Sequence, residues 1–202
     1  MKKKGAEVKV SRQQAAKNRQ RVVEVAARLF REKGTNGVSV PAIMRAAHLT
    51  HGGFYAQFKS KRDLEQQAVK LAAAQNLAWF EAQVKNNKRN PFEALVNAYL
   101  AGWHRDDPGA GCALAAMSPE SYRQNPAVRR ILTGLSRSML DILAFVAADG
   151  PGSKSDRGLS TLASLVGAVV LSRAVDDRRY SDKILTTVRR SLLREHRRRR
   201  AS

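Results

Sequence analysis

The chain has 202 residues, of which 43% are apolar and one is a cysteine. This length favours one domain or two small ones, and the apolar fraction is sufficient for a core, which excludes a globally disordered protein. A formal net charge of +20 favours a polyanionic partner, either nucleic acid or an anionic membrane surface.

The basic residues are concentrated towards the two ends of the chain. Residues 1–64 contain 15 Lys/Arg and 4 Asp/Glu, a net charge of +11, whereas residues 65–188 contain 15 and 12, a net charge of +3. We therefore expect the N-terminal third to contact phosphate groups. Residues 189–202 contain 7 Lys/Arg and 1 Asp/Glu. This end is either a solvated helix terminus that complements the helix dipole or a source of nonspecific attraction to DNA.

The cysteine content and the apolar runs predict a cytoplasmic protein without a membrane segment. Cys112 is the single cysteine, so no intramolecular disulfide can form, which fits a reducing compartment. Residues 1–10 are basic but no apolar segment follows them, so no secretory signal is predicted. The most apolar run, Leu159–Leu171, is too short for a membrane span and is expected to be a buried helix.

The first predicted element is a disordered basic arm over residues 1–10, and a helix from about Ser11 to Lys33 follows it. Apolar residues recur at helical spacing along this helix and form one face. They are Val22, Val25, Ala26, Leu29 and Phe30. Gly34 is expected to end the helix.

A second helix is expected after Ser39, whose side chain can cap it, with Pro41 in the first turn. Its inward-facing residues are expected to be Ile43, Ala46 and Ala47. A tight turn at His48 and Leu49 leads to a third, short helix, Thr50–Ala56, with Thr50 as its cap. This third helix is too small and too polar to exist for packing alone. The pattern is typical of a helix-turn-helix, which presents one helix to the major groove of DNA.

The third helix contains two adjacent glycines, Gly52 and Gly53, each of which costs roughly 0.5–1 kcal/mol of helix stability relative to alanine. This cost indicates close approach of the backbone to another molecule; the alternative is a plain turn. His51 can hydrogen-bond a base edge or a phosphate, and Tyr55, one turn later, can reach a phosphate or a thymine methyl group.

Phe54 and Phe58 are expected to point into a small core beneath the third helix. A fourth helix, capped by Ser60, is expected to run to about Val84. Its apolar stripe is expected to contain Leu64, Ala68 and Leu71. Lys61 lies in its first turn, where the lysine and the backbone N–H groups form an anion site suited to a phosphate.

The rest of the chain is expected to be helical, without strands or internal repeats. The expected helices cover about residues 91–103, 112–117, 126–148, 157–175 and 181–196. Breaks rich in Gly, Pro and Asp separate them.

Residues 19–68 resemble the TetR family of bacterial transcriptional regulators. The resemblance rests on AARLFREKG in the first helix, SVPAIMRAAHLT in the second helix and turn, and GGFYAQFKSKRDL in the third helix and exit. It implies an all-α fold. Residues 11–64 would form an N-terminal three-helix, helix-turn-helix DNA-binding domain, and residues 65–202 a C-terminal helical domain for effector binding and dimerisation.

The resemblance also implies a homodimer that binds a palindromic double-stranded DNA operator, usually as a repressor, and is released by a small-molecule effector. The residues expected to contact DNA are Ser39, Val40, Thr50, His51, Gly52, Gly53, Tyr55, Ala56, Gln57 and Lys61. His48 departs from the family, which usually has glycine there, and a positive φ is expected at that position. Gln57 replaces a frequent histidine, and Val40 and Pro41 replace residues that are often polar.

The segments GCALAAMSPE and LVGAVVLSRAVDDRRYSDKIL are similar to parts of some family members, in which the last two helices form the dimer interface. The interface residues expected here are Leu162, Leu165, Val166, Val169, Val170, Ile184 and Val188. The same stripe also fits an internal core.

An effector is expected to bind in an apolar cleft between helices of the second domain. The residues expected to line it are Trp79, Trp103, His104, Cys112, Met117, Tyr122, Met139 and Phe145, each of which also fits ordinary core packing. Some relatives sense electrophiles or oxidants through a cysteine like Cys112. His104 and Arg105 would lower its pKa if they were close in space, whereas the alternative, which we favour, is an inert buried thiol.

No catalytic motif is present: the chain has no GxSxG, no P-loop and no GxGxxG after a strand. His48 and His51 have no nearby Cys or carboxylate to complete a zinc site. We therefore expect no enzymatic activity, no cofactor and no bound metal. Two other interpretations remain: a sequence-indifferent nucleoid or RNA-binding protein driven by charge, and a peripheral membrane protein with basic arms.

Overall fold

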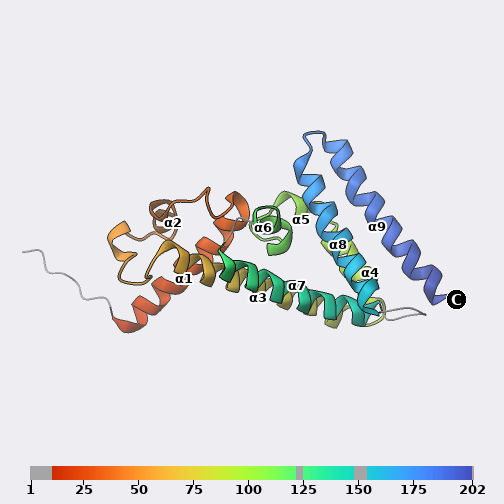
Figure 1. The fold of residues 1–202 in the computed structure, drawn as a ribbon, viewed down its shortest axis with the longest axis horizontal. Coiled ribbons are helices and arrows are strands. Elements are labelled where there is room, and N and C mark those ends of the chain that lie inside the picture. Colours follow the sequence, from red (N-terminus) through yellow and green to blue (C-terminus); the bar gives the residue numbers. More distant parts are fainter. Residues whose placement is uncertain (1–10, 122–124, 148–153, 202) are drawn as a thin grey trace, which may run out of the picture.

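A computed structural model describes residues 11–121, 125–147 and 154–201, and these residues form helices and connecting turns without a strand (Figure 1). The helices are α1 (Arg12–Lys33), α2 (Val40–Ala46), α3 (Lys61–Asn86), α4 (Pro91–Tyr99), α5 (Gly102–Asp106), α6 (Ala113–Ser121), α7 (Pro126–Val146), α8 (Lys154–Ala174) and α9 (Arg178–Arg200), with a short 3-10 helix, η1 (His51–Gly53). The predicted all-α fold is confirmed. The predicted arm of residues 1–10 lies outside the described residues.

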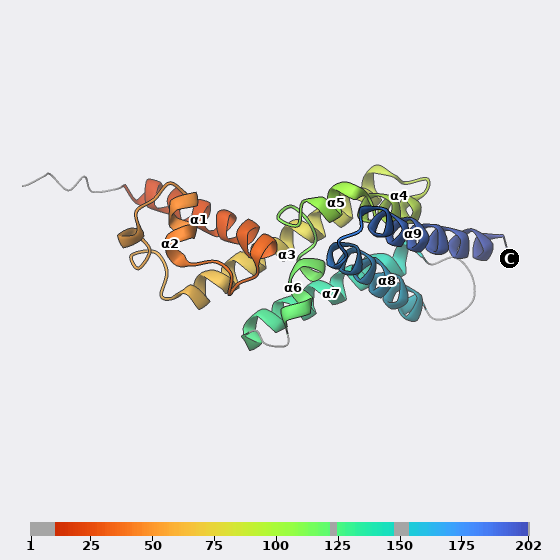
Figure 2. The ribbon, with the colours of Figure 1, turned by 90° about the horizontal axis from the view of Figure 1, so that it is seen from above.

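The molecule is elongated, with α1, α2 and η1 at one end and the α8–α9 hairpin at the other (Figures 1 and 2). Helix α3 begins in the first group and continues into the second, where it packs along α7. The expected domain boundary between residues 64 and 65 therefore falls in the first turn of a continuous helix. One continuous helix thus joins the two parts of the molecule.

Helix α1 has the ends that its sequence predicts. The Ser11 hydroxyl accepts a hydrogen bond from the Gln14 backbone N–H at 3.1 Å, and Gly34 ends the helix with a φ of 70°. Positive φ is a conformation that glycine adopts without a steric penalty. The buried side chains are Val22, Val23, Ala26, Ala27, Phe30 and Arg31. Val25 and Leu29 of the predicted face are only half-buried but pack against the core.

Helix α2 is capped as predicted, because the Ser39 hydroxyl accepts from the Ala42 backbone N–H at 3.3 Å. Its inward face differs by one residue: Met44 is buried beside Ile43, whereas Ala46 is exposed. The apolar length of Met44 lets it reach the core from the neighbouring helical position. His48 has a φ of 56°, the left-handed value expected where the family usually has glycine.

The core of the N-terminal part is closed by two aromatic rings. Phe54 and Phe58 are buried and stack with centroids 5.4 Å apart, as the prediction of a small core requires. The Arg19 guanidinium lies 4.8 Å from the centre of the Phe58 ring and also donates to Gln67 Oε1 at 2.6 Å. A cation over a ring face is attracted by the ring quadrupole. These contacts therefore hold together α1, the segment that follows η1, and α3.

The expected helix over residues 91–103 is two helices, α4 and α5, separated at Leu100 and Ala101. The His104 ring nitrogen Nδ1 bonds the Tyr99 carbonyl oxygen at 2.6 Å. A side-chain donor thus satisfies a carbonyl at the end of α4, and this stabilises the break. Periodicity along the sequence does not reveal such a partner.

Two of the later helices, α6 and α9, are longer than predicted. Helix α6 continues past Met117 to Ser121 with Pro119 inside it, and α9 extends to Arg200. Arg197 pairs with Glu93 of α4 at 2.8 Å and Arg199 with Glu195 at 2.6 Å. The basic end is therefore a helix terminus whose charges are partly paired. None of the helices in the described ranges combines the length and apolarity needed to cross a bilayer.

Candidate nucleic-acid interface and internal cavity

The segment predicted as the third helix is shorter than expected. Only His51–Gly53 forms a helix, of the 3-10 type, followed by turns through Gln57. The Gly53 N–H bonds the Thr50 carbonyl at 3.1 Å, and Phe54 N–H bonds the His51 carbonyl at 3.0 Å. The predicted side-chain cap is wrong, because Thr50 makes no capping hydrogen bond. Two consecutive glycines disfavour a longer α-helix, so the tighter form is found here.

This short segment presents polar and aromatic groups to the outside. His51, Gly52 and Ala56 are exposed, and the Tyr55 side chain is 70% exposed. The Tyr55 ring packs edge-on against His51, with centroids 6.2 Å apart. Since Phe54 and Phe58 anchor the segment from below, its outer face is held in position without needing to be buried.

The two glycines have backbone conformations open to any residue, and there is free space where their side chains would be. Neither Gly52 nor Gly53 has a positive φ; among the glycines of the described ranges only Gly34 does. A Cβ atom placed on Gly52 would meet nothing within 4 Å, and one on Gly53 would have its nearest neighbours at 3.9 Å. Neither a positive φ nor internal crowding therefore calls for glycine at either position. Turns do follow η1 at residues 55–57, as the alternative of a plain turn requires.

The start of α3 carries both positive and negative groups. The Ser60 hydroxyl accepts from the Asp63 N–H at 3.1 Å, as predicted for the cap, and the Asp63 carboxylate accepts from the Lys59 N–H at 3.1 Å. Lys61 is half-buried in the first turn. The Asp63 carboxylate weakens the positive potential of the helix end. The cations available to a phosphate there are Lys59, Lys61 and the exposed Arg62.

The remaining residues predicted to contact DNA differ in their exposure. Ser39 is exposed, whereas Val40 is half-buried and packs against the core. The Gln57 side chain folds back and donates from Nε2 to the Gly53 carbonyl at 3.1 Å. Gln57 therefore supports the glycine-containing turn from within.

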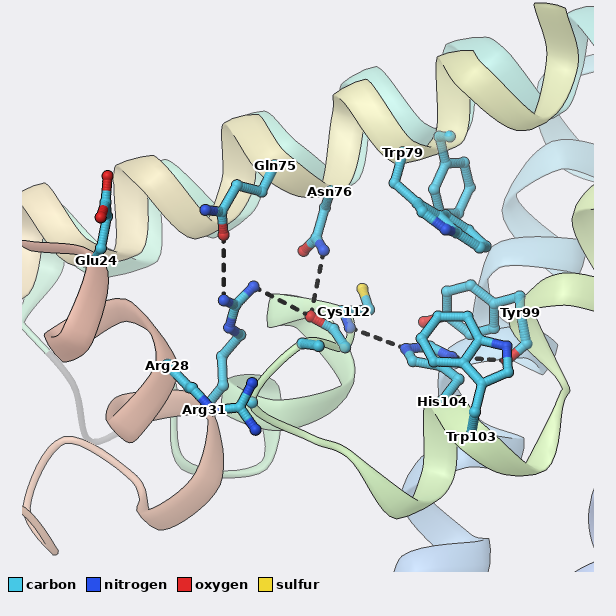
Figure 3. Close-up of a pocket in the computed structure, with 14 residues that line it drawn as sticks. Glu24, Arg28, Arg31, Gln75, Asn76, Trp79, Tyr99, Trp103, His104 and Cys112 are labelled. Atoms are coloured by element: carbon cyan, nitrogen blue, oxygen red, sulfur yellow. Dashed lines mark hydrogen bonds between the residues drawn. The ribbon is translucent and has the colours of Figure 1, made fainter. Parts of the chain in front are cut away.

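A cavity of about 380 Å³ lies between α1, α3, α5 and the turn that precedes α6 (Figure 3). Its lining comes from both parts of the molecule. The lining residues are Glu24, Arg28, Arg31, Gln75, Asn76, Trp79, Phe80, Tyr99, Trp103, His104, Gly109, Ala110, Gly111 and Cys112. This volume lies within the range of small-molecule pockets in proteins.

Half of the residues predicted to line an effector cleft line this cavity. They are Trp79, Trp103, His104 and Cys112. Met117 and Met139 are buried elsewhere in the core, and Phe145 on α7 is 74% exposed, so none of these three lines it. Apolar side chains at helical spacing fill the space between helices, and Phe145 lies on the outer side of its helix. Tyr122 lies outside the described residues.

Sequence reasoning missed the polar wall of the cavity. Arg31 lies near the C-terminal end of α1, where cations usually serve the helix dipole, yet its side chain is only 7% exposed. It donates from Nε to the Ala27 carbonyl at 3.1 Å, from NH1 to the Gly111 carbonyl at 3.3 Å and from NH2 to Gln75 Oε1 at 3.1 Å. Burial lowers its pKa. Two of these partners are 44 and 80 residues away in sequence, so no local signal marked them.

His104 is held as a neutral imidazole at the other end of the cavity. Its Nε2 accepts from the Cys112 N–H at 2.9 Å, so Nδ1 carries the proton and donates to the Tyr99 carbonyl. Burial lowers the pKa of His104 to about 4. A ring that accepts a backbone N–H cannot be protonated there without losing that bond.

The minor hypothesis of a Cys112 thiol with a lowered pKa is not supported. Cys112 is buried, and burial raises the pKa of its thiol. His104 is neutral, and the Arg105 guanidinium is directed to Asp106 at 2.7 Å and Asp182 at 2.5 Å. Neither His104 nor Arg105 therefore lowers the pKa of the thiol. The favoured alternative of an inert thiol fits this environment.

The predicted dimer stripe divides into two sets. Leu162, Leu165 and Val169 are buried within the single chain, so they belong to its core rather than to a surface. The other four, Val166, Val170, Ile184 and Val188, are half-buried. Large apolar side chains nearby are exposed. They are Leu159 at 53%, Leu171 at 58% and Tyr180 at 53%.

Comparison with known proteins links the N-terminal part to a family. Residues 22–68 match the family described as "Bacterial regulatory proteins, tetR family". A stretch of 54 residues is 41% identical to the HTH-type transcriptional regulator AcrR of Shigella flexneri. It covers 27% of this chain and 25% of AcrR, so the match spans about a quarter of that curated relative.

Solved structures are similar over most of the chain. A TetR transcriptional regulator from Chloroflexus aurantiacus has a TM-score of 0.76 at 22% identity and covers 90% of this chain and 96% of its own. The reduced form of E. coli NemR has a TM-score of 0.75 at 15% identity, covering 87% and 95%. AibR in complex with isovaleryl coenzyme A and operator DNA has a TM-score of 0.59 at 17% identity, covering 87% and 97%. At these identities the likeness establishes the fold.

Proposed function

Because the chain belongs to the tetR family of bacterial regulatory proteins, we propose that it is a homodimeric transcriptional regulator that binds a palindromic DNA operator. In this proposal it acts as a repressor in the cytoplasm, associates with the nucleoid when bound to DNA, and is released by a small-molecule effector. It catalyses no reaction.

The observation that carries this proposal is the state of Gly52 and Gly53. Their φ values and free surroundings would accept a larger residue, so an internal reason for two consecutive glycines is missing. DNA binding would explain the glycines, because a larger side chain at these positions would keep the backbone away from the base edges. His51 and Tyr55 flank the glycines and are exposed.

The electrostatic environment supports the same surface. Residues 1–64 carry a net charge of +11, from 15 Lys/Arg and 4 Asp/Glu. Lys59 and Lys61 lie just after the glycine-containing turn, at the start of α3. Lysines beside a groove-reading segment position the protein by contacting phosphates.

Dimerisation is proposed through the α8–α9 hairpin at the far end of the molecule. Leu159 and Leu171 on α8 and Tyr180 on α9 expose apolar surface, and α8 also has small exposed residues that allow close approach of a second helix, such as Ala163. A two-fold axis there would present two copies of η1. Their half-sites would be separated by about 34 Å or a multiple of this distance.

The cavity beside α1 is the proposed effector site. It is bordered by α1 of the DNA-binding part and by α3, α5 and the turn before α6. A ligand there touches both parts of the molecule and can therefore bias their relative position. AibR, which has a similar fold, is described as a complex with both a coenzyme A ester and operator DNA.

Selection from a random duplex library with the full-length protein tests the proposal. The selected sites should be palindromic, and binding to them should survive excess random DNA at moderate salt. A selection that yields no consensus, with binding lost to random competitor, would instead support a charge-driven nucleoid or RNA-binding protein. Liposome binding without DNA binding would support the peripheral membrane interpretation.

A further inference from the structure

We propose that the cavity between α1 and α3 binds a compact aryl carboxylate, with the carboxylate on Arg31 and the ring against Trp79 and Trp103. This rests on the proposed function only in taking the ligand to be the effector. Figure 3 shows the two ends that such a molecule would join: Arg31 lies at one end and the Trp79 and Trp103 rings at the other.

The cationic end is a buried guanidinium whose hydrogen-bond partners are all neutral. Arg31 donates to two backbone carbonyls and to the Gln75 amide oxygen, and in the described part of the chain it makes no ion pair. Arg28, its neighbour on α1, is 53% exposed and pairs with Glu32 at 2.8 Å and Asp107 at 3.1 Å. A charge away from water is costly unless a counter-charge accompanies it, so Arg31 favours an anionic ligand.

The guanidinium geometry suits a carboxylate. Its planar fork matches two carboxylate oxygens, and such pairs are stronger than hydrogen bonds to neutral acceptors. A carboxylate would replace the Gly111 carbonyl or the Gln75 amide as the acceptor. No protein bond of Arg31 to a charged group has to be broken.

The opposite end is an aromatic wall with room at its surface. The rings of Trp79 and Trp103 meet edge to face with centroids 6.1 Å apart, and Trp79 stacks on His104 at 6.4 Å. Trp103 is 48% exposed, although tryptophan is usually well buried. His104 is neutral, with a pKa lowered to about 4. The cation beside it, Arg173, donates to the His104 carbonyl at 2.6 Å and does not line the cavity, so this end presents no charged side chain to a ligand. It fits an uncharged ring.

The spacing of the two ends limits the length of the ligand. Gln75, which accepts from Arg31, and Trp79 are four residues apart on α3, a rise of about 6 Å. One helical turn between carboxylate and ring corresponds to an aryl group on a chain of a few carbons. The cavity volume of about 380 Å³ agrees with a molecule of this size.

An aromatic cation is the alternative, because Glu24 also lines the cavity. Glu24, however, is exposed and its Oε1 accepts from the Gln20 amide at 2.9 Å. It also lies on the far side of Arg31 from the aromatic rings (Figure 3). Charges near water are screened more than buried ones, so Arg31 outweighs Glu24 in selecting the ligand charge.

Three matched compounds test the charge preference: phenylbutyrate, phenylbutanamide and phenylbutylamine. Calorimetric titration into the full-length protein should give an affinity for the acid at least about tenfold above that for the amide or the amine. Both tryptophans of the chain line the cavity, so a change in intrinsic fluorescence on binding reports this site directly.

Substitution of Arg31 tests the assigned contact. Arg31→Met should weaken phenylbutyrate binding about tenfold or more and leave phenylbutanamide binding within about twofold. Arg31→Lys, which keeps the charge, should retain part of the preference and serves if the methionine variant is unstable. Arg21→Met on the exposed side of α1 is the control and should bind like the parent.

Three outcomes would overturn this assignment. The protein could bind the amine in preference to the acid, or it could fail to bind the acid. Both Arg31 variants could also lose amide and acid binding alike. These titrations contain no DNA. If phenylbutyrate binds through Arg31 but does not release a selected operator, the carboxylate assignment stands and the proposed effector response fails. If phenylbutylamine releases the operator instead, the proposed function stands and the carboxylate assignment fails.

Discussion

At the scale of single residues, Gly34 and Gly52 differ in whether the fold itself requires glycine. Gly34 needs its glycine, because its φ is positive and a Cβ atom would approach the Glu120 carboxylate at 2.8 Å. Gly52 has neither constraint. A substitution at Gly52 should therefore leave the fold intact, so any loss of DNA binding that it causes can be attributed to this surface.

Gly52→Ala should leave stability unchanged or raise it by about 0.4–1 kcal/mol, because it reduces the freedom of the unfolded chain. It should weaken operator binding, since the added methyl group lies where the bases approach. Thermal unfolding and titration of a selected operator measure the two effects. Gly134→Ala on α7 is the matched control: its Cβ also meets open space, so it should keep full DNA affinity. An unimpaired Gly52→Ala variant would contradict the docking model.

Tyr55 is the most exposed aromatic side chain of the helix-turn-helix, at 70%. Tyr55→Ala should lower operator affinity by about 1–3 kcal/mol without unfolding the protein, since little buried surface is lost. Tyr55→Phe separates the hydroxyl from the ring. Circular dichroism and operator titration measure folding and binding, and normal binding by the alanine variant would argue against the predicted contact.

His104 makes stability depend on pH. Its pKa is about 4 in the folded chain against 6.5 for the ordinary group, so below pH 6.5 the unfolded state binds a proton that the folded state does not. The contribution of His104 to the free energy of unfolding is therefore fully present above pH 6.5 and is lost as the pH falls towards 4. Between pH 7 and 5 this amounts to about 2 kcal/mol.

A comparison of the parent with His104→Gln checks this dependence. Both proteins are unfolded in urea at pH 7 and at pH 5, and the parent should lose more stability than the variant. Glu65, whose pKa burial raises, changes stability in the opposite direction but is common to both proteins. Equal losses in the two proteins would show that His104 does not titrate as described.

At the scale of helices, α3 connects the two parts of the molecule and the turn before α6 lies against α1. The Gly111 carbonyl accepts from Arg31 of α1 and from Asn76 of α3, each at 3.3 Å. Asn76 Oδ1 also accepts the Ala113 N–H at 2.6 Å. A ligand that alters the Arg31 contact therefore acts on the first helix of the DNA-binding part and on the start of α6.

The α8–α9 hairpin offers a test of the proposed dimer. Leu171→Glu should produce a monomer, because a charge would be buried between copies while no core contact of the single chain is lost at a side chain 58% exposed. Sedimentation at several concentrations measures the mass. Ala78→Glu on the exposed side of α3 is the control and should stay dimeric. A Leu171→Glu variant that remains dimeric would place the interface elsewhere.

At the scale of the whole molecule, the charge of +20 makes affinity for any DNA depend on salt. Operator affinity should fall linearly on a log–log plot as salt increases, with a slope of about −0.9 for each phosphate contacted. Lys61→Ala should reduce the magnitude of the slope by about 1 and weaken all sequences alike. An unchanged slope would remove Lys61 from the phosphate contacts.

Local sequence signals predicted the N-terminal part well. The caps at Ser11, Ser39 and Ser60, the end at Gly34 and the positive φ at His48 depend on residues within a few positions of one another. Short-range hydrogen bonds and backbone sterics decide such features, so the sequence alone is sufficient for them. The buried pair Phe54 and Phe58 followed from the same local pattern.

The cavity could be predicted only in part. Trp79 and Trp103 were predicted to line it because their side chains are large and apolar. Met117 and Phe145 were predicted on the same grounds but lie elsewhere. A side chain lines a cavity or fills a core according to which helix packs opposite it. Periodicity within one helix contains no information on that neighbour.

The sequence by itself determined the helical class, the helix-turn-helix and the basic character of its surface, because spacing, capping and charge are properties of short segments. Only the tertiary structure decided that Arg31 is buried without a carboxylate partner, that His104 is neutral, and that Leu165 belongs to the core rather than to an interface. Burial and pKa depend on groups brought together from distant parts of the chain, and those groups meet only when the helices have packed.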